Sequence, residues 1–432
     1  MATEYWPISR LRTKTGLGVW EHRGKVAVAG IGFAPTMRRW DGQDLSTSVG
    51  ALTIIAAQKA LDDAGISKGE IDGVVACPIG MGDNWGPESV TGRPYFAPPY
   101  DTEDGLIGTS SDWLIKNMGL WNAKSTFHAT GCFNTAMSVG AQVVGDGLAH
   151  TILVIRGMGN PPGRYHQSPE TNYSAGRQWT APFDWRLEPL IAYGFDQYCR
   201  KYGKTHEMVA PFVLNQHRNG LMMPEGYYAQ NRPEMPTKED YLAARWVVKP
   251  MCIMDMDMPI QTAVAFVVTT AERARGMKQK PVYILNHASQ RGVVRSTTET
   301  LDETEAFSDH IAQMCYEGSG LTAKDLDIFN PYDGYTLFTQ YYLDAFGWHG
   351  VKRGEALDFY AGDISVEGPH PFSPSGGNNG NGRTRSWGQY DCIQQLRGQA
   401  GKRQVRIKAE TAIAGAFTPG TSDWTVYGIS PD

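Results

Sequence analysis

The sequence lacks the marks of several large protein classes. Its six cysteines are scattered and form no Cys-x-x-Cys pair, which argues against a zinc ribbon or a disulfide framework. Its net charge is −5, so no basic surface for nucleic acid is indicated. Its longest apolar stretches, such as Ala263–Val268, are far too short to cross a bilayer.

What remains is an ordinary globular composition. Of the 432 residues, 41% are hydrophobic and 20% are charged, which is enough to bury a large core. Residues 1–25 carry charges throughout and no apolar signal core, so we expect a cytoplasmic protein. The Gly-rich stretch Gly376–Gly382 is not followed by Lys-Ser/Thr, which argues against binding of a nucleoside triphosphate.

One segment of the chain occurs twice. Residues 57–72 and 312–327 match without a gap: Ala-Gln, then Gly-Ile or Gly-Leu, then an acidic residue, an aliphatic residue and Asp. Both copies predict a helix that ends at a glycine, a short capped turn and a buried strand. A repeat that spans most of the chain predicts two similar halves packed around one core.

Strands and helices alternate in both copies, which favours an α/β fold with helices covering sheets. Strands are predicted at residues 25–31, 73–77, 151–156, 281–286, 327–330 and 404–409. Helices are predicted at residues 46–64, 135–147, 305–318 and from the Gly-rich turn at 376–382 to about 397. The turns at 128–134 and 378–384 correspond in the two copies, and a helix N-terminus at such a junction can hold an oxyanion.

Two stretches interrupt this alternation. Residues 78–110, rich in Gly, Pro and Asp, predict a loop with a surface function. Residues 157–260, rich in Trp, Tyr, Pro and Met, predict a loop insertion that carries substrate contacts. We therefore expect an N-terminal extension at 1–24, an N-terminal half at 25–280 that includes the insertion, and a C-terminal half at 281–432.

Several segments carry a resemblance to a known family. Trp246–Arg275, which ends in Thr-Ala-Glu-Arg-Ala-Arg, is similar to the mid-chain signature of the thiolase superfamily, especially of the sterol carrier protein X-type thiolases. Thr135-Ala136-Met137 and Gly147-Leu148-Ala149 look like the helix after the family's nucleophile. Gly376-Gly377 and Gln395–Gly398 look like its C-terminal signature.

This resemblance covers about residues 25–430 and implies the thiolase fold. That fold has two duplicated βαβαβαββ halves in five layers, α-β-α-β-α. The resemblance also implies a homodimer. One branch of the superfamily works with a separate protein that has a zinc ribbon and an OB-fold, and for this branch we expect a heterotetramer.

The catalytic motifs depart from the thiolase pattern. A thiolase takes the acyl group on a cysteine thiolate at a helix N-terminus. Counted without gaps, that position falls on Thr130, and Cys132 lies two residues further on. The family's His-Asp-Cys-Phe reads Tyr-Asp-Gly-Tyr at Tyr332–Tyr335, and the histidine of its Gly-His-Pro reads Arg383. The final Cys-x-Gly region reads Ala412–Gly415, so every acid–base group of thiolase chemistry is altered.

One branch of the superfamily departs in a similar manner. These are the thiolase-like aldolases that cleave side chains of steroid acyl-CoA esters. Their Tyr-Asp-x-Phe-Thr motif is similar to Tyr332–Thr336, although their second tyrosine is replaced here by Arg383. The resemblance implies retro-aldol cleavage of a bulky, steroid-like or aromatic β-hydroxyacyl-CoA. Coenzyme A then enters as part of the substrate, and we expect no metal and no permanently bound cofactor.

In this chemistry Tyr332 would handle the proton of the substrate's β-hydroxyl, as a phenolate or as a proton relay. A tyrosine with a pKa near 10 is a poor base at neutral pH. Arg383 would lower that pKa or hold the enolate oxygen directly, and the sequence leaves both roles open. The expected substrate-binding residues are Thr130, Asp333, Tyr335 and Gly377.

Two alternatives stay open. Cys132 lies at a predicted helix start, where thiolates are stabilised, and with His128 nearby it would make the chain a thiolase or C-acyltransferase. The simultaneous loss of the family's motifs instead favours a catalytically silent subunit. The carboxylates in Met254–Asp257 lack the spacing of a metal site and predict a loop.

Overall fold

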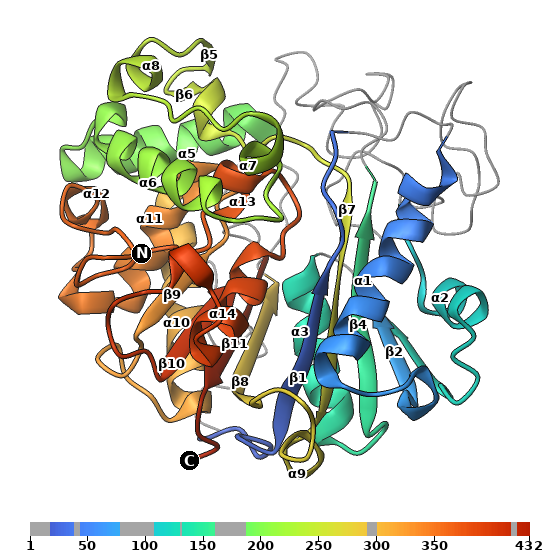
Figure 1. The fold of residues 1–432 in the computed structure, drawn as a ribbon. Coiled ribbons are helices and arrows are strands. Elements are labelled where there is room, and N and C mark those ends of the chain that lie inside the picture. Colours follow the sequence, from blue (N-terminus) through green and yellow to red (C-terminus); the bar gives the residue numbers. More distant parts are fainter. Residues whose placement is uncertain are drawn as a thin grey trace, which may run out of the picture.

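The computed structural model describes residues 18–38, 44–77, 108–129, 132–159, 187–291, 300–415 and 421–432. These residues form a nine-stranded sheet in the order β3-β2-β4-β7-β1-β8-β11-β10-β9 (Figure 1). Its strands are β1 (Val26–Phe33), β2 (Gly73–Ala76), β3 (Ser125–His128), β4 (Thr151–Met158), β7 (Thr262–Thr270), β8 (Val282–Arg291), β9 (Ile328–Pro331), β10 (Thr411–Gly415) and β11 (Thr421–Gly428).

The two halves of this sheet repeat one pattern of pairing. They meet where β1 and β8 pair antiparallel. Outward from β1, β7 and β4 follow in antiparallel pairs and β2 in a parallel pair. Outward from β8, β11 and β10 follow in antiparallel pairs and β9 in a parallel pair. The duplication predicted from the repeat is therefore confirmed, although β3, β7, β10 and β11 were not among the predicted strands.

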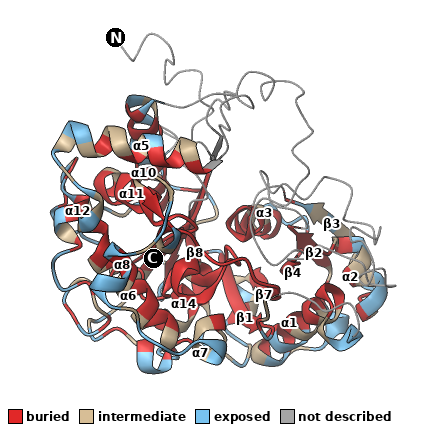
Figure 2. Cartoon of the chain, turned by 90° about the horizontal axis from the view of Figure 1, so that it is seen from above, coloured by how far each residue is buried: buried red, intermediate tan, exposed pale blue. Residues whose placement is uncertain are grey.

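Equivalent helices accompany equivalent strands. Helix α1 (Val49–Ala64) ends at Gly65 and α10 (Leu301–Ser319) ends at Gly320, both with the left-handed backbone that glycine adopts without strain (φ 72° and 69°). Helix α3 (Phe133–Gly145) begins after Cys132, and α14 (Trp387–Arg397) begins after Ser386. In Figure 2, α1 and α3 lie on opposite sides of β1, β7 and β4.

The layers follow from the alternation of side chains along the strands. In β8, Val282 and Ile284 join an inner core with residues of α3 and α14, whereas Tyr283 and Leu285 join an outer core with residues of α10. Successive side chains of a strand point to opposite faces, so each half of the sheet is covered on both sides. The result is the predicted thiolase fold in five layers, with α3 and α14 in the middle layer.

The predicted loop insertion is mostly helical in its described part, residues 187–260. The aromatic residues that suggested a binding loop are instead the buried stripe of a helix: Phe195 and Tyr198 of α5 are buried, and Tyr198 packs against Tyr341. The elements are α5 (Leu187–Tyr202), η6 (His206–Val209), α6 (Ala210–Leu221), α7 (Tyr227–Asn231), α8 (Lys238–Leu242), β5 (Trp246–Val248), β6 (Met251–Cys252) and η7 (Ile253–Asp255).

Two other local predictions are wrong. Residues 404–409 form no strand, because their alternating side chains run beside α14, where the Val405 amide donates to Gln395 Oε1. The Gly-rich turn contains a short helix, α13 (Gly377–Asn381). The remaining elements are η3 (Leu45–Thr47), η4 (Lys68–Glu70), α2 (Ser111–Met118), α9 (Ala271–Ala274), η8 (Thr336–Phe338), α11 (Thr339–Phe346), η9 (Trp348–Gly350), α12 (Ala356–Phe359) and η10 (Gly401–Arg403).

Strands β1 and β8 begin within one residue of the starts of the two predicted halves, residues 25 and 281. The exact domain boundaries stay predictions. Most of the predicted extension at 1–24 and of the predicted surface loop at 78–110 lies outside the described residues. In the part of the chain that the structure describes, no helix has both the length and the apolar character of a membrane span.

Candidate active site

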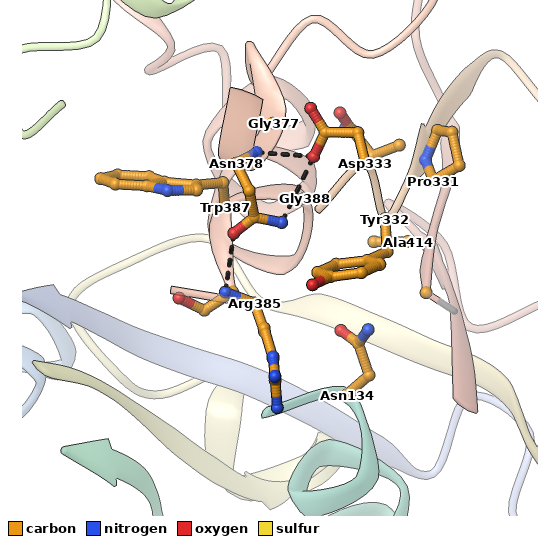
Figure 3. A pocket seen from close by; sticks show the side chains of 13 residues that line it. Asn134, Pro331, Tyr332, Asp333, Gly377, Asn378, Arg385, Trp387, Gly388 and Ala414 are labelled. Carbon is orange, nitrogen blue, oxygen red and sulfur yellow. Dashed lines mark hydrogen bonds between the residues drawn. The ribbon is translucent and has the colours of Figure 1, made fainter. Parts of the chain in front are cut away.

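A polar pocket lies at the carboxyl ends of the parallel strands β9 and β10 (Figure 3). The starts of α3, α13 and α14 close it from the other side. Ligands in α/β proteins commonly bind at this edge of a sheet, where helix N-termini and strand ends meet. The described residues that line the pocket are Asn134, Asn330, Pro331, Tyr332, Asp333, Gly377, Asn378, Arg385, Ser386, Trp387, Gly388, Ala414 and Gly415.

One wall of this pocket, the Gly-rich wall, is the helix α13 (Gly377–Asn381). Backbone contact with the insertion holds this wall in place. A Cβ atom on Gly220 of α6 would lie 2.0 Å from the Gly380 carbonyl oxygen. A Cβ atom on Gly380 of α13 would lie 2.0 Å from the Gln216 carbonyl oxygen. Only glycines allow two helices to approach so closely. The sequence therefore places α13, and with it Gly377 and Asn378, directly against the insertion.

Tyr332 follows β9 and turns its ring into the pocket. Its amide donates to the Gly415 carbonyl oxygen at 2.8 Å, and its ring points into the space between Arg385 and Asn134 (Figure 3). A Cβ atom on Gly334 would lie 1.9 Å from the Tyr332 hydroxyl oxygen, so the phenol rests directly on the backbone of that glycine. Because residue 334 is a glycine, the space that a side chain would fill is available to the Tyr332 phenol.

The electrostatic surroundings keep the Tyr332 phenol protonated. Burial raises the pKa of the phenol, and the nearby Asp257 carboxylate raises it further. Arg385 and Arg383 act in the opposite direction, but burial is the largest contribution. The predicted pairing of Tyr332 with Arg383 therefore exists as an electrostatic interaction, but it does not yield a phenolate.

Asp333 is completely buried, and its carboxylate holds the Gly-rich wall in place. It accepts hydrogen bonds from the Asn378 amide (2.6 Å), the Asn379 amide (3.0 Å) and Gln216 Nε2 (2.7 Å). Burial raises the pKa of this carboxyl to about 6, and these hydrogen bonds limit the rise. A Cβ atom on Gly377 would lie 2.1 Å from Asp333 Oδ2. Asp333 and Gly377, two of the four predicted binding residues, line the pocket, and the Asp333 carboxylate already accepts its hydrogen bonds from the protein.

The predicted Arg383 and the nearby Arg385 occupy different places. Arg383 is buried, and its amide donates to the Met258 carbonyl oxygen at 2.7 Å. Arg385 lines the pocket, and its amide donates to Asn378 Oδ1 at 2.9 Å, so Asn378 joins Arg385 to Asp333 (Figure 3). Its φ of 60° is unusual for a residue with a side chain, and such strain often marks functional sites.

Cys132 caps α3 but is absent from the described lining of the pocket. The residue has no exposed surface. Burial raises the pKa of its thiol, and the Asp423 carboxylate raises it further. That carboxylate accepts from Thr135 Oγ1 at 2.7 Å and from the Ser289 hydroxyl, so it stays beside the thiol. These surroundings disfavour the thiolate that acyl transfer requires.

Three further predicted residues have these positions. His128 accepts a hydrogen bond from the Ser111 amide at 3.2 Å, which is a structural contact. The Tyr335 hydroxyl lies 3.5 Å from Glu188 Oε1 of α5, and Tyr335 is not among the described lining residues. Thr130 lies outside the described residues.

The segment predicted as a plain loop, Met254–Asp257, lies against the turn at residues 332–336, the Tyr332 turn. The Asp257 amide donates to the Gly334 carbonyl oxygen at 3.0 Å, and Asp257 is buried. Sequence reasoning did not single out Asp257, Arg385, Asn134 and Asn378, although Asn134 and Asn378 lie in the two turns predicted to hold an oxyanion. The second arginine of Arg-Thr-Arg was a visible signal for Arg385, but nothing local announces the long-range contacts of the other three.

Comparisons with known proteins agree with this fold. A family model described as thiolase C-terminal domain-like matches residues 290–423. A 17-hydroxy-3-oxo-4-pregnene-20-carboxyl-CoA lyase of Mycobacterium tuberculosis is 30% identical over 230 residues, which are 50% of this chain and 58% of that one. A steroid side-chain-cleaving aldolase of Thermomonospora curvata is 24% identical over 414 residues, which are 92% and 96% of the two chains.

A solved structure named Ltp2-ChsH2(DUF35) aldolase superposes with a TM-score of 0.76 at 23% identity, covering 94% of this chain and 98% of that one. An acetyl-CoA acetyltransferase from Syntrophomonas wolfei superposes with a TM-score of 0.63 at 14% identity. The duplicated sheet and the two central helices thus give this chain the thiolase-like fold of these proteins, and residues 290–423 match the thiolase C-terminal domain-like family.

Proposed function

We propose that this protein is a carbon–carbon lyase that cleaves a bulky β-hydroxyacyl-CoA by a retro-aldol reaction and releases a short acyl-CoA. One observation carries the proposal: a buried phenol, Tyr332, occupies the polar pocket, while the Cys132 thiol is absent from its described lining. The lyase and aldolase names of the two relatives support this reaction class and a steroid-like acyl group.

A protonated tyrosine suits this reaction as a relay. The β-hydroxyl gives its proton to the Tyr332 oxygen as the bond between the α and β carbons breaks and a carbonyl forms at the β carbon. In the same concerted step the phenol gives its own proton to the α carbon, which keeps the electron pair of the broken bond, so the phenol oxygen never holds two protons. Tyr332 thus ends with the proton count it began with, and a raised pKa does not impede the step.

The developing charge on the thioester oxygen needs donors that are already in place. The Arg385 side chain lines the pocket, and in our proposal it faces this oxygen, with Arg383 adding positive potential at Tyr332. Donors of this kind lower a reaction barrier by about 3 kcal/mol each. Asp333 and Gly377 shape the wall, while Tyr335 supports the turn from the side of the insertion.

The proposal includes no permanently bound cofactor and no metal, with coenzyme A entering as part of the substrate. It also includes a homodimer and a separate zinc-ribbon and OB-fold protein that helps to bind the acyl-CoA. The structural neighbour pairs Ltp2 with ChsH2, which supports a two-protein assembly. Sedimentation of the purified chain, alone and with such a partner, measures the subunit composition.

A panel of β-hydroxyacyl-CoA esters tests the function. We expect mass spectrometry to detect a ketone or aldehyde together with acetyl-CoA or propionyl-CoA, from esters with ring-bearing acyl groups. An acyl-CoA formed from a 3-ketoacyl-CoA and free coenzyme A would instead indicate thiolase chemistry. Absence of turnover with every ester, with and without the partner, would indicate a silent subunit.

Acid should inactivate the enzyme through Asp333. Because the pKa of this carboxyl is raised to about 6, protonation there removes acceptors from the Gly-rich wall, so kcat should be halved near pH 6 and fall by about tenfold per pH unit below it. The folded carboxyl binds its proton more readily than the unfolded one. Asp333 itself therefore adds stability as the pH falls through this window, and its titration does not unfold the chain.

Two variants assign the acid limb in a pH–rate profile. Gln216→Leu removes a donor to the Asp333 carboxylate, which raises its pKa further, so the midpoint should move to higher pH. Asp344→Asn is the matched control, because burial raises the pKa of Asp344 to about 6 as well, in a different cluster with Tyr198. If the midpoint moves in Asp344→Asn and not in Gln216→Leu, the loss of kcat at acid pH does not arise from Asp333.

A further inference from the structure

A second buried carboxylate, Asp255, connects the insertion to the turn that carries Tyr332. It has no exposed surface. Its Oδ2 accepts from His206 Nε2 (2.6 Å) and the Cys252 amide (2.7 Å), and its Oδ1 accepts from the Tyr241 hydroxyl (2.7 Å) and Thr336 Oγ1 (2.9 Å). The first three donors belong to the insertion, and the fourth belongs to the Tyr332 turn.

The backbone beside Asp255 follows the same turn. Met256 and Tyr335 form an antiparallel bridge, and the next residue, Asp257, donates its amide to the Gly334 carbonyl oxygen at 3.0 Å. Thus residues 255–257 lie along residues 334–336, with Asp255 bonded to Thr336 at one end. The other end of this pairing is Gly334, on which the Tyr332 phenol rests.

These contacts make Asp255 a rigid point. A carboxylate without exposed surface is costly unless donors satisfy both oxygens, and here each oxygen has two. The His206 ring also stacks on the Tyr241 ring, with centroids 5.0 Å apart and an interplanar angle of 14°. Loss of one donor therefore disturbs the other contacts of a group that cannot turn to water.

We propose that Asp255 is a positioning residue, which sets the Tyr332 phenol in register with the insertion through Thr336. Its catalytic consequence rests on the proposed lyase function. The insertion contacts the Gly-rich wall through α6 and the Tyr332 turn through Asp255. Both sides of the pocket are therefore attached to the insertion. Substrate contacts made by the insertion are thereby coupled to the place where the proton is transferred.

The same side chains suggest a metal site, and the structure argues against it. The ligand atoms of His206, Cys252 and Asp255 lie within 4.8 Å of one another. However, Asp255 already accepts four hydrogen bonds, and burial raises the pKa of the Cys252 thiol to about 12. A divalent cation would have to displace these protons, so we expect zinc addition and chelator to leave the melting temperature of the wild-type protein unchanged.

The first arm of the test uses Thr336→Val, which keeps the shape of the side chain and removes its hydroxyl. We expect kcat on a cleaved ester to fall by about tenfold with KM unchanged, because an interaction that aligns the phenol is lost. Thr336→Ser restores the hydroxyl and should restore kcat. Thr269→Val is the matched control: Thr269 is buried, and its hydroxyl bonds to Thr151 Oγ1 (2.9 Å) and the His150 carbonyl oxygen (2.7 Å), far from the pocket.

The second arm needs no activity and uses Tyr241→Phe, which removes one donor on the insertion side. We expect amide hydrogen exchange to accelerate in residues 334–338 as well as in residues 252–257, as measured by mass spectrometry. Faster exchange confined to the insertion would overturn the coupling, and so would unchanged kcat in a folded Thr336→Val protein. A melting temperature that rises with zinc would overturn it in favour of a metal site.

These outcomes separate the two proposals. If the wild-type chain cleaves no ester, the lyase function fails, while hydrogen exchange in Tyr241→Phe still decides whether Asp255 couples the insertion to the turn. If the wild-type chain cleaves an ester and both arms leave the turn unaffected, the lyase function stands and the positioning role fails.

Discussion

Tyr332→Phe should lower kcat by about a thousandfold while leaving the fold and substrate affinity intact, because a general acid–base group contributes 10²–10⁴ to a rate. The change removes one oxygen from a buried ring and leaves its packing on Gly334 in place. Steady-state kinetics on a cleaved ester, with product quantified by mass spectrometry, measure the effect.

Cys132→Ala is the matched control for this prediction. The thiol is buried and its pKa is raised, so we expect the variant to keep kcat within about threefold of the wild type, as for other residues outside the reacting set. The thiolase alternative predicts the reverse: loss of activity in Cys132→Ala and little change in Tyr332→Phe. The two variants together therefore distinguish the phenol from the thiol.

The alkaline side of the pH profile distinguishes a relay from a phenolate base. Burial raises the pKa of Tyr332, so the phenol keeps its proton over the whole neutral range. A relay needs that proton, and kcat should stay level from about pH 7 to about pH 9. A kcat that rises about tenfold per pH unit over this range would show that the phenolate is the active form, contrary to our mechanism.

The halves of the fold were predictable because local and global signals agree in them. The backbone turns left-handed after each outer helix, and this conformation favours glycine. Gly65 and Gly320 occupy that position in the two copies. The capping pair Ser67 and Glu70 marks the next turn in the first copy, and its hydrogen bonds are present. Each of these signals depends only on residues that are close together in the sequence, so it can be recognised without knowledge of the tertiary structure.

The errors occur where tertiary packing decides. Residues 404–409 alternate as a strand does, yet the Arg406 amide donates to the Val366 carbonyl oxygen and the segment stays outside the sheet. In the insertion, aromatic composition suggested a loop, although Phe195 and Tyr198 have the spacing of a buried helical face. Composition was given more weight there than periodicity.

The candidate site divides along the same line. Tyr332, Asp333 and Gly377 were predicted because short motifs carry them, and all three line the pocket. Asp255 and Asp257 were set aside because their roles depend on contacts with residues 334–336, far along the sequence. No local pattern encodes such a contact, so only the folded chain reveals it.

Gly334→Ala should reduce kcat by about a hundredfold, about a tenth of the effect expected for loss of the phenol itself. The new methyl group would lie 1.9 Å from the Tyr332 hydroxyl oxygen and 2.2 Å from its Cζ, so the ring must leave its place. The neighbours prevent a compensating shift of the backbone, because the Gly334 carbonyl oxygen accepts from the Asp257 amide and Asp333 is held by the Gly-rich wall. A misplaced reacting group costs about a hundredfold in rate.

Gly69→Ala is the matched control for this substitution. The nearest atoms to its new methyl group are 3.7 Å and 3.9 Å away, which is ordinary contact, so we expect wild-type kcat. Glycine at 334 is required for space and not for a left-handed backbone, because Gly334 is not among the glycines with positive φ. The double variant Gly334→Ala with Tyr332→Phe should therefore be no slower than Tyr332→Phe alone, since the methyl group acts only by displacing the phenol. An additive loss in the double variant would show that Gly334 serves the reaction by a second route.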